Sequence, residues 1–184
     1  MAQKISAVLK EGQKAPRFAL TDKDGVVHKL APAKARYTVV FFYPKDNTPG
    51  CTIEASEFSS ALRSFATKKI ALFGVSGGSD KTKTAFCAKH KLTVTLLSDE
   101  DFSVANQYGA FGEKSFMGRT FNGILRKTFI MDKRGVVVKI FDGVKPAGHA
   151  SEVLAAIAEL ESKTKGKKEP ATRTSKPKKA PRKG

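Results

Sequence analysis

The stretch FFYPKDNTPGCT, residues 41–52, joins an apolar strand to an amphipathic helix through a short polar turn. The strand is predicted over residues 37–43, which are rich in Val and Phe. The helix is predicted from about Thr48 to Phe65 because apolar residues recur at steps of three and four and share one face. These residues are Cys51, Ala55, Phe58, Leu62 and Phe65. Thr48 is a favourable N-cap, and Pro49 suits the first helical position, where its missing N–H costs nothing.

Cys51 falls in the first turn of this helix, beside free backbone N–H groups and the positive end of the helix dipole. A thiolate at such a position is stabilised, and cysteines there can have pKa values of roughly 3.5–7.5 instead of about 8.5. Free cysteines are more often small buried hydrophobic residues, so the alternative is a core cysteine. The strand–turn–helix context favours a cysteine that acts as a nucleophile.

The pattern Pro44-x-x-x-Thr48-x-x-Cys51 resembles the active-site motif of the peroxiredoxins, and residues 41–55 resemble the subgroup called peroxiredoxin Q or bacterioferritin comigratory protein. The resemblance covers about residues 7–160, and the basic C-terminal tail does not match the family. It continues in four further segments, which are Leu97–Asp99, Tyr108-Gly109, Gly118–Asp132 and Gly148-His149.

The resemblance implies a thiol-specific peroxidase that reduces hydrogen peroxide and organic hydroperoxides through a sulfenic acid on Cys51, in antioxidant defence. It implies that the Thr48 hydroxyl and the Cys51 N–H bind the peroxide oxygens, and that Pro44 shields the site from water. Arg126 would stabilise the thiolate and the transition state, with Arg119 as the competing arginine. Each residue also has a plainer interpretation, in which the proline ends a strand, the threonine only caps a helix and the arginine is solvated.

Cys87 is the second cysteine, and the resemblance makes it the candidate resolving cysteine. In some members that cysteine lies five residues after the first one, where this chain has Ser56, and in others about 36 residues on, where it has Cys87. The products would be a Cys51–Cys87 disulfide and water, with thioredoxin or glutaredoxin as the reductant. We expect the two Cα atoms to lie more than about 7 Å apart before oxidation, so that local unfolding must precede the disulfide. The alternative is a core cysteine in a one-cysteine peroxidase.

The remaining pattern predicts an α/β fold, in which strands and helices alternate before a final hairpin and helix. The resemblance implies a thioredoxin-like fold, a central mixed sheet with helices on both faces, over a domain of residues 1–161. The expected segments are a hairpin over 15–30, strands at 70–76, 94–97, 124–131 and 136–141, helices at 79–91, 103–108 and 147–160, and an exposed loop at 109–123.

The chain of 184 residues is long enough for one domain with a real core, and its net charge is +17. No run of 18 apolar residues occurs, and the N-terminus has no apolar core of signal-peptide length. We therefore expect no membrane association and a cytoplasmic or nuclear location, where two cysteines are more often catalytic than structural. The subgroup resemblance suggests a monomer.

The C-terminal segment 162–184 has a different composition. From Lys163 onward it carries ten Lys and Arg residues against one Glu, with no aromatic residue. Such a segment buries too little apolar surface to offset its chain entropy, so we expect disorder. The run KPKKAPRK, residues 176–183, resembles nucleic-acid-binding tails and nuclear-targeting signals. A solubilising tail without a partner is the alternative.

The sequence gives little support for a metal site, a cofactor or a disulfide oxidoreductase. His28, His90 and His149 show no ligand spacing with each other or with the cysteines, so no metal site is expected. No flavin, nicotinamide or haem signature is present, and we expect no cofactor. A disulfide oxidoreductase would need Cys-x-x-Cys, but Thr48 and Glu54 occupy the positions three before and three after Cys51.

Overall fold

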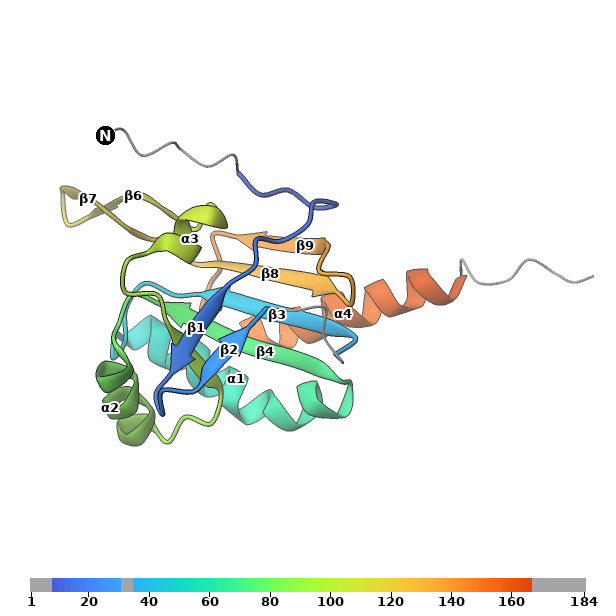
Figure 1. The fold of residues 1–184 in the computed structure, drawn as a ribbon, viewed down its shortest axis with the longest axis horizontal. Coiled ribbons are helices and arrows are strands. Elements are labelled where there is room, and N and C mark those ends of the chain that lie inside the picture. Colours follow the sequence, from blue (N-terminus) through green and yellow to red (C-terminus); the bar gives the residue numbers. More distant parts are fainter. Residues whose placement is uncertain (1–7, 31–34, 167–184) are drawn as a thin grey trace, which may run out of the picture.

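The computed structural model describes residues 8–30 and 35–166, which form two β-sheets and four helices (Figure 1). The main sheet has the strand order β2-β1-β5-β4-β3-β8-β9, and β6 and β7 form a separate hairpin. The strands are β1 (Ala19–Asp22), β2 (Val27–Lys29), β3 (Tyr37–Phe42), β4 (Ile70–Ser76), β5 (Thr95–Ser98), β6 (Phe111–Phe116), β7 (Arg119–Ile124), β8 (Lys127–Asp132) and β9 (Val137–Asp142). The helices are α1 (Pro49–Thr67), α2 (Asp80–His90), α3 (Ser103–Gln107) and α4 (His149–Gly166).

Strand β3 lies inside the sheet between β4 and β8, and all six of its residues are buried. It pairs in parallel with β4 and antiparallel with β8, so the sheet is mixed. Alternate side chains of β3 enter two different apolar clusters. Val39 and Phe41 pack with α1, α2 and α4, whereas Val40 and Phe42 pack with α3 and the N-terminal segment. Burial on both faces explains why the strand reads as a continuous apolar run.

Helices therefore cover both faces of the sheet, and the expected thioredoxin-like architecture is confirmed. In Figure 1, α1 and α4 lie together behind the sheet, and α3 lies on the other side of it. The turn from β3 to α1 lies at the carboxyl end of β3, where parallel α/β sheets commonly bind ligands.

The segment 109–123, expected to be an exposed loop, is largely a β-hairpin. Strands β6 and β7 pair from Phe111 opposite Ile124 to Phe116 opposite Arg119, and Met117 and Gly118 make the turn with positive φ angles of 50° and 74°. The strand pattern was missed because β7 is exposed along most of its length and so has no apolar alternation. The predicted strand 124–131 is correspondingly split, since β7 ends at Ile124 and β8 begins at Lys127.

Helix α4 continues to Gly166, five residues beyond the expected domain boundary at residue 161. Ser162 and Thr164 donate hydrogen bonds from their hydroxyls to carbonyls one turn back, at 3.0 and 2.8 Å. A helix can continue beyond its last apolar residue in this way, so the spacing of apolar residues alone predicts an end that is too early. The rest of the predicted tail, from residue 167, lies outside the described residues. Within the described ranges, no helix has both the length and the hydropathy to cross a bilayer.

Candidate active site

Cys51 is the third residue of α1 after the N-cap Thr48, as the sequence predicts. The side chain is 1% exposed and belongs to the apolar cluster that α1 forms with the sheet. The Thr48 hydroxyl does not cap the helix; it donates instead to the Lys45 carbonyl at 3.1 Å. The backbone N–H groups of the first turn, including that of Cys51, therefore receive no side-chain cap from Thr48 and are available to a ligand.

Arg126 lies directly against Cys51. Its Nη2 is 3.3 Å from the Cys51 sulfur, and its Nη1 forms an ion pair with Glu54. Sheet register explains the approach, because Phe42 at the end of β3 pairs with Lys127, which places Arg126 beside the turn that leads into α1. Gly50 leaves room for the guanidinium, since a Cβ there would lie 3.3 Å from Arg126 Nη2 and 3.2 Å from Pro146 Cγ.

Of the two arginines that the sequence offered, only Arg126 reaches the cysteine. Arg119 is exposed at the tip of the β6–β7 hairpin, where it pairs with Phe116. Arg126 itself lies between β7 and β8 rather than within a strand, and it is largely buried. Burial alone would lower the pKa of Arg126, but the charges of Glu54 and Cys51 outweigh it and raise that pKa. The guanidinium therefore stays positively charged next to the sulfur.

Glu54 is a member of the site that sequence reasoning missed. Its side chain is 0% exposed, and it pairs with Nη1 of Arg126 while Nη2 of the same guanidinium faces Cys51. Burial raises the pKa of Glu54 from 4.5 to about 7, although Arg126 opposes the rise. Its second oxygen, Oε1, is buried without a hydrogen-bond partner. A signal was present, because Glu54 lies three residues after Cys51 and so falls on the apolar face of the helix.

Pro44 lies at the edge of the site and is half-buried. It lines a hollow of about 510 Å³ together with Asp46, Gly77 and Phe102, on the side of the turn that faces α2. The predicted role of Pro44 in excluding water from Cys51 stays a prediction.

Cys87 lies on α2 and is 6% exposed. It belongs to the same apolar cluster as Cys51, but the two cysteines are not joined by a disulfide. Burial raises the pKa of the Cys87 thiol, and the nearby charge of Lys23 opposes this effect in part. A buried thiol of this kind has little nucleophilic character until its surroundings open.

The histidines are engaged in other contacts. His149 is buried, with its two ring nitrogens 2.8 Å from the Thr128 hydroxyl and 2.8 Å from Glu152. Burial lowers the pKa of His149, so the ring is neutral at pH 7. Over residues 8–30 and 35–166, no group of three or more His, Cys, Asp and Glu side chains is placed to hold a metal ion.

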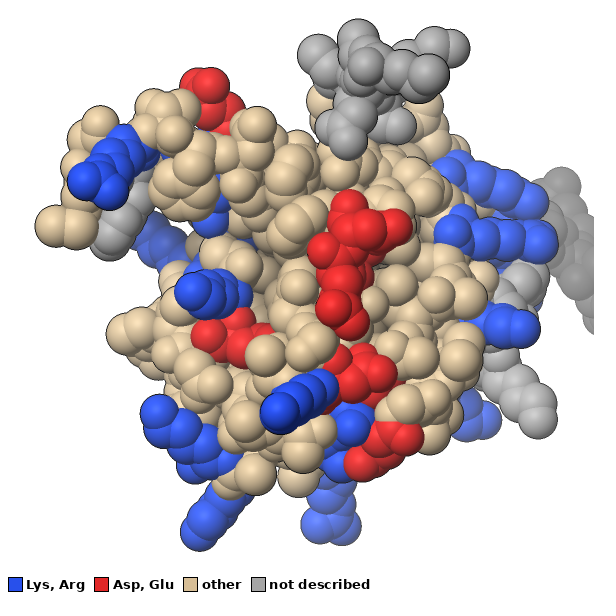
Figure 2. All heavy atoms as spheres, turned by 60° about the vertical axis from the view of Figure 1, so that its left-hand side comes forward, with Lys and Arg blue, Asp and Glu red and all other residues tan. Residues whose placement is uncertain are grey.

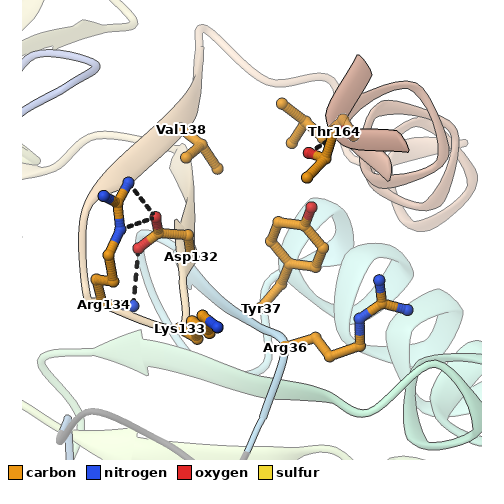
Figure 3. Close-up of a pocket in the computed structure, with 8 residues that line it drawn as sticks. Arg36, Tyr37, Asp132, Lys133, Arg134, Val138 and Thr164 are labelled. Carbon is orange, nitrogen blue, oxygen red and sulfur yellow. Dashed lines mark hydrogen bonds and ion pairs between the residues drawn. The ribbon is translucent and has the colours of Figure 1, made fainter. Parts of the chain in front are cut away.

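A second hollow of about 510 Å³ lies at the opposite end of β3 (Figure 3). Tyr37, the first residue of β3, points into it towards Thr164 of α4. Its lining is basic, but Arg134 pairs with Asp132 at 2.8 Å and Arg36 pairs with Glu161 at 3.0 Å. We interpret both as structural ion pairs away from Cys51, since the first lies within the β8–β9 turn and the second ties the residue before β3 to α4.

The charge of the described domain is spread out. Figure 2 shows basic side chains around the edge of one face and acidic side chains near its centre, with no continuous basic surface among the described residues in that view. The densest positive charge in the chain is the C-terminal segment.

The family model described as AhpC/TSA family matches residues 11–140. The chain belongs to this family. Within it the chain is a peroxiredoxin of the peroxiredoxin Q or bacterioferritin comigratory protein subgroup, and thus a thiol peroxidase. A putative peroxiredoxin bcp of Helicobacter pylori strain J99 is 43% identical over 149 residues, which cover 81% of this chain and 98% of the relative.

Solved structures give the same assignment for this peroxiredoxin. The Xanthomonas campestris bacterioferritin comigratory protein, whose structure concerns its alkyl peroxide reduction activity, is 36% identical with a TM-score of 0.72, and the match covers 78% of this chain and 91% of that one. Two structures of Xanthomonas campestris peroxiredoxin Q, both 37% identical with a TM-score of 0.72, are Cys→Ser variants at different positions. They match 78% of this chain and 90% and 91% of theirs. The two variant positions are 36 residues apart, the spacing between Cys51 and Cys87.

Proposed function

We propose that this peroxiredoxin reduces hydrogen peroxide and organic hydroperoxides at Cys51, forms a disulfide with Cys87, and is returned to the dithiol by a thioredoxin-type reductant. The observation that carries the proposal is the guanidinium of Arg126, 3.3 Å from a cysteine sulfur in the first turn of a helix.

In the first step, the Cys51 thiolate attacks one peroxide oxygen and the O–O bond breaks. The sulfur becomes a sulfenic acid, and the second oxygen takes a proton and leaves as water or alcohol. Negative charge builds on the departing oxygen, so donors aimed at it lower the barrier. Arg126 supplies fixed N–H donors at the sulfur, and the uncapped N–H groups of the first turn supply others. Glu54 holds the guanidinium in this position.

In the second step, the Cys87 sulfur attacks the Cys51 sulfur. The S–O bond breaks as the S–S bond forms, and hydroxide leaves with the thiol proton as water. The 36-residue spacing of the cysteine variants in the Xanthomonas peroxiredoxin Q structures supports Cys87 as the attacking thiol. Because both cysteines are buried and free in the described structure, we expect α1, α2 or both to unwind locally before the sulfurs meet.

Peroxide turnover with thioredoxin and thioredoxin reductase tests the proposal. Cys51→Ser should abolish turnover, and peroxide-treated wild type should show a crosslink between the peptides that hold Cys51 and Cys87. Cys87→Ser should instead accumulate sulfenic or overoxidised Cys51, or disulfide-linked dimers. Wild type that turns over without the crosslink would make this a one-cysteine enzyme, and an active Cys51→Ser variant would refute the assignment.

A further inference from the structure

A buried cluster of polar side chains joins the turn that precedes Cys51 to the helix that carries Cys87. Asp46 is its centre, and we call the group the Asp46 cluster. The carboxylate accepts hydrogen bonds from the Tyr43 hydroxyl at 2.7 Å, the Thr82 hydroxyl at 2.9 Å and the Ser76 hydroxyl at 3.2 Å. The fifth member is Lys83, whose Nζ lies 3.5 Å from Asp46 Oδ2.

Lys83 is 0% exposed, which is rare for a lysine unless it is paired. Its Nζ also donates to the Ser76 hydroxyl at 2.7 Å and to the Gly78 carbonyl at 3.1 Å. Burial lowers the pKa of Lys83, and Asp46 opposes that effect. A buried ion pair is a poor source of net stability, but breaking one costs much more than an exposed contact would. Such a pair therefore holds one specific arrangement of its neighbours.

The Asp46–Lys83 pair joins two segments that each carry one of the cysteines. Asp46 lies five residues before Cys51, and Lys83 lies four residues before Cys87, one helical turn away on the same side of α2. Tyr43 adds an apolar contact, because the centroid of its ring lies 6.4 Å from the ring centroid of Phe86, the neighbour of Cys87. The turn cannot separate from α2 without breaking the contacts of Thr82 and Lys83 with Asp46.

We propose that the Asp46 cluster is a latch that keeps the turn and α2 together until Cys51 is oxidised, and that its opening limits the rate of disulfide formation. Asp46, Thr82 and Lys83 are then positioning residues for the resolving step. The inference rests on the proposed function, since it assumes that Cys87 resolves.

The test is Thr82→Val, which keeps the shape of the side chain but removes the hydroxyl that Asp46 and the Ser79 carbonyl share as acceptors, at 2.9 and 2.8 Å. Its matched control is Thr84→Val on the same helix, because the Thr84 hydroxyl donates to the Lys23 and Asp80 carbonyls and does not contact the turn. Thr82→Ser should retain the hydroxyl and behave as wild type. Lys83→Met is a stronger change, but loss of its buried charge endangers folding, so the conclusion depends on Thr82.

Two measurements are made on each variant. After one equivalent of hydrogen peroxide, quenched samples give the rate of Cys51 oxidation and the rate of the Cys51–Cys87 crosslink by mass spectrometry. Thr82→Val should speed the crosslink about threefold to tenfold, the range expected for one hydrogen bond, and leave Cys51 oxidation within about twofold. Amide hydrogen exchange of the reduced protein should rise in residues 43–52 and 79–91 and stay unchanged in β8 and β9.

The outcomes separate the latch from the proposed function. If Thr82→Val and Thr84→Val share the wild-type crosslinking rate and exchange pattern, the latch is overturned while the resolving role of Cys87 stands. If exchange rises throughout the sheet, Thr82 has only a general structural role and the latch is again overturned. A wild type that forms no crosslink contradicts the proposed function itself.

Discussion

Glu54→Gln should change how the stability of the protein depends on pH. The native pKa of Glu54 is raised by burial to about 7 from 4.5, so the folded state binds a proton that the unfolded state releases between these values. The contribution of Glu54 to stability is therefore fully present below about pH 4.5, and it is lost as the pH rises to about 7. The resulting change in the free energy of unfolding is about 3 kcal/mol, because a shift of one pKa unit corresponds to about 1.4 kcal/mol.

Glutamine carries no charge at any pH, so Glu54→Gln should abolish this term. The free energy of unfolding, measured by urea titration at pH 5 and pH 8, should show the variant gaining about 2–3 kcal/mol relative to wild type between the two values. Comparing variant with wild type at each pH cancels the contribution of His149, whose lowered pKa makes stability rise with pH instead.

Glu100→Gln is the control, because Glu100 is an exposed glutamate outside the site. Its stability should follow that of wild type at both pH values. If Glu54→Gln also follows wild type, Glu54 is ionised at pH 5 in the folded state, and the account of its burial beside Arg126 is wrong.

Two further predictions concern the site and the tail. Gly50→Ala should slow Cys51 oxidation by roughly tenfold, because the added Cβ would lie 3.3 Å from Arg126 Nη2 and displace the guanidinium. Ser60→Ala, at an exposed position of α1, is the control and should leave the oxidation rate unchanged. An equal loss of rate in both variants would exclude displacement of Arg126 as the cause. Deletion of residues 167–184 should leave peroxide kinetics unchanged and remove any salt-dependent binding to DNA or RNA, whereas a large loss of turnover would make the tail part of the enzyme.

The sequence predicts the part of the fold that is buried and periodic. Strand β3 and helix α1 carry apolar residues at the spacing of their own structure, so the position of Cys51 in a first helical turn could be inferred before any coordinates. The β6–β7 hairpin could not, because exposed strands carry no such pattern. Its two-residue turn at Met117-Gly118 was the available signal.

For the candidate site, prediction from the sequence is limited by contacts between residues that are distant in the chain. Arg126 was inferred from resemblance alone, and its contact with Cys51 depends on the register of β3 with β8. The residue types of Glu54 and Lys83 are typical of exposed helix positions, but the structure shows that both side chains are buried and paired. Charged residues on an apolar helix face are the signal that could have found them.

The central claim is that Arg126 activates Cys51 towards peroxide. Its most direct test is the single-turnover rate of Cys51 oxidation by hydrogen peroxide in Arg126→Ala, with Arg119→Ala as the matched control. Removing a well-placed stabilising donor costs roughly 10²–10³ in rate, so Arg126→Ala should slow oxidation by that factor while Arg119→Ala stays near wild type. An Arg126→Ala variant that reacts at the wild-type rate, or an Arg119→Ala variant that loses it, would contradict the account.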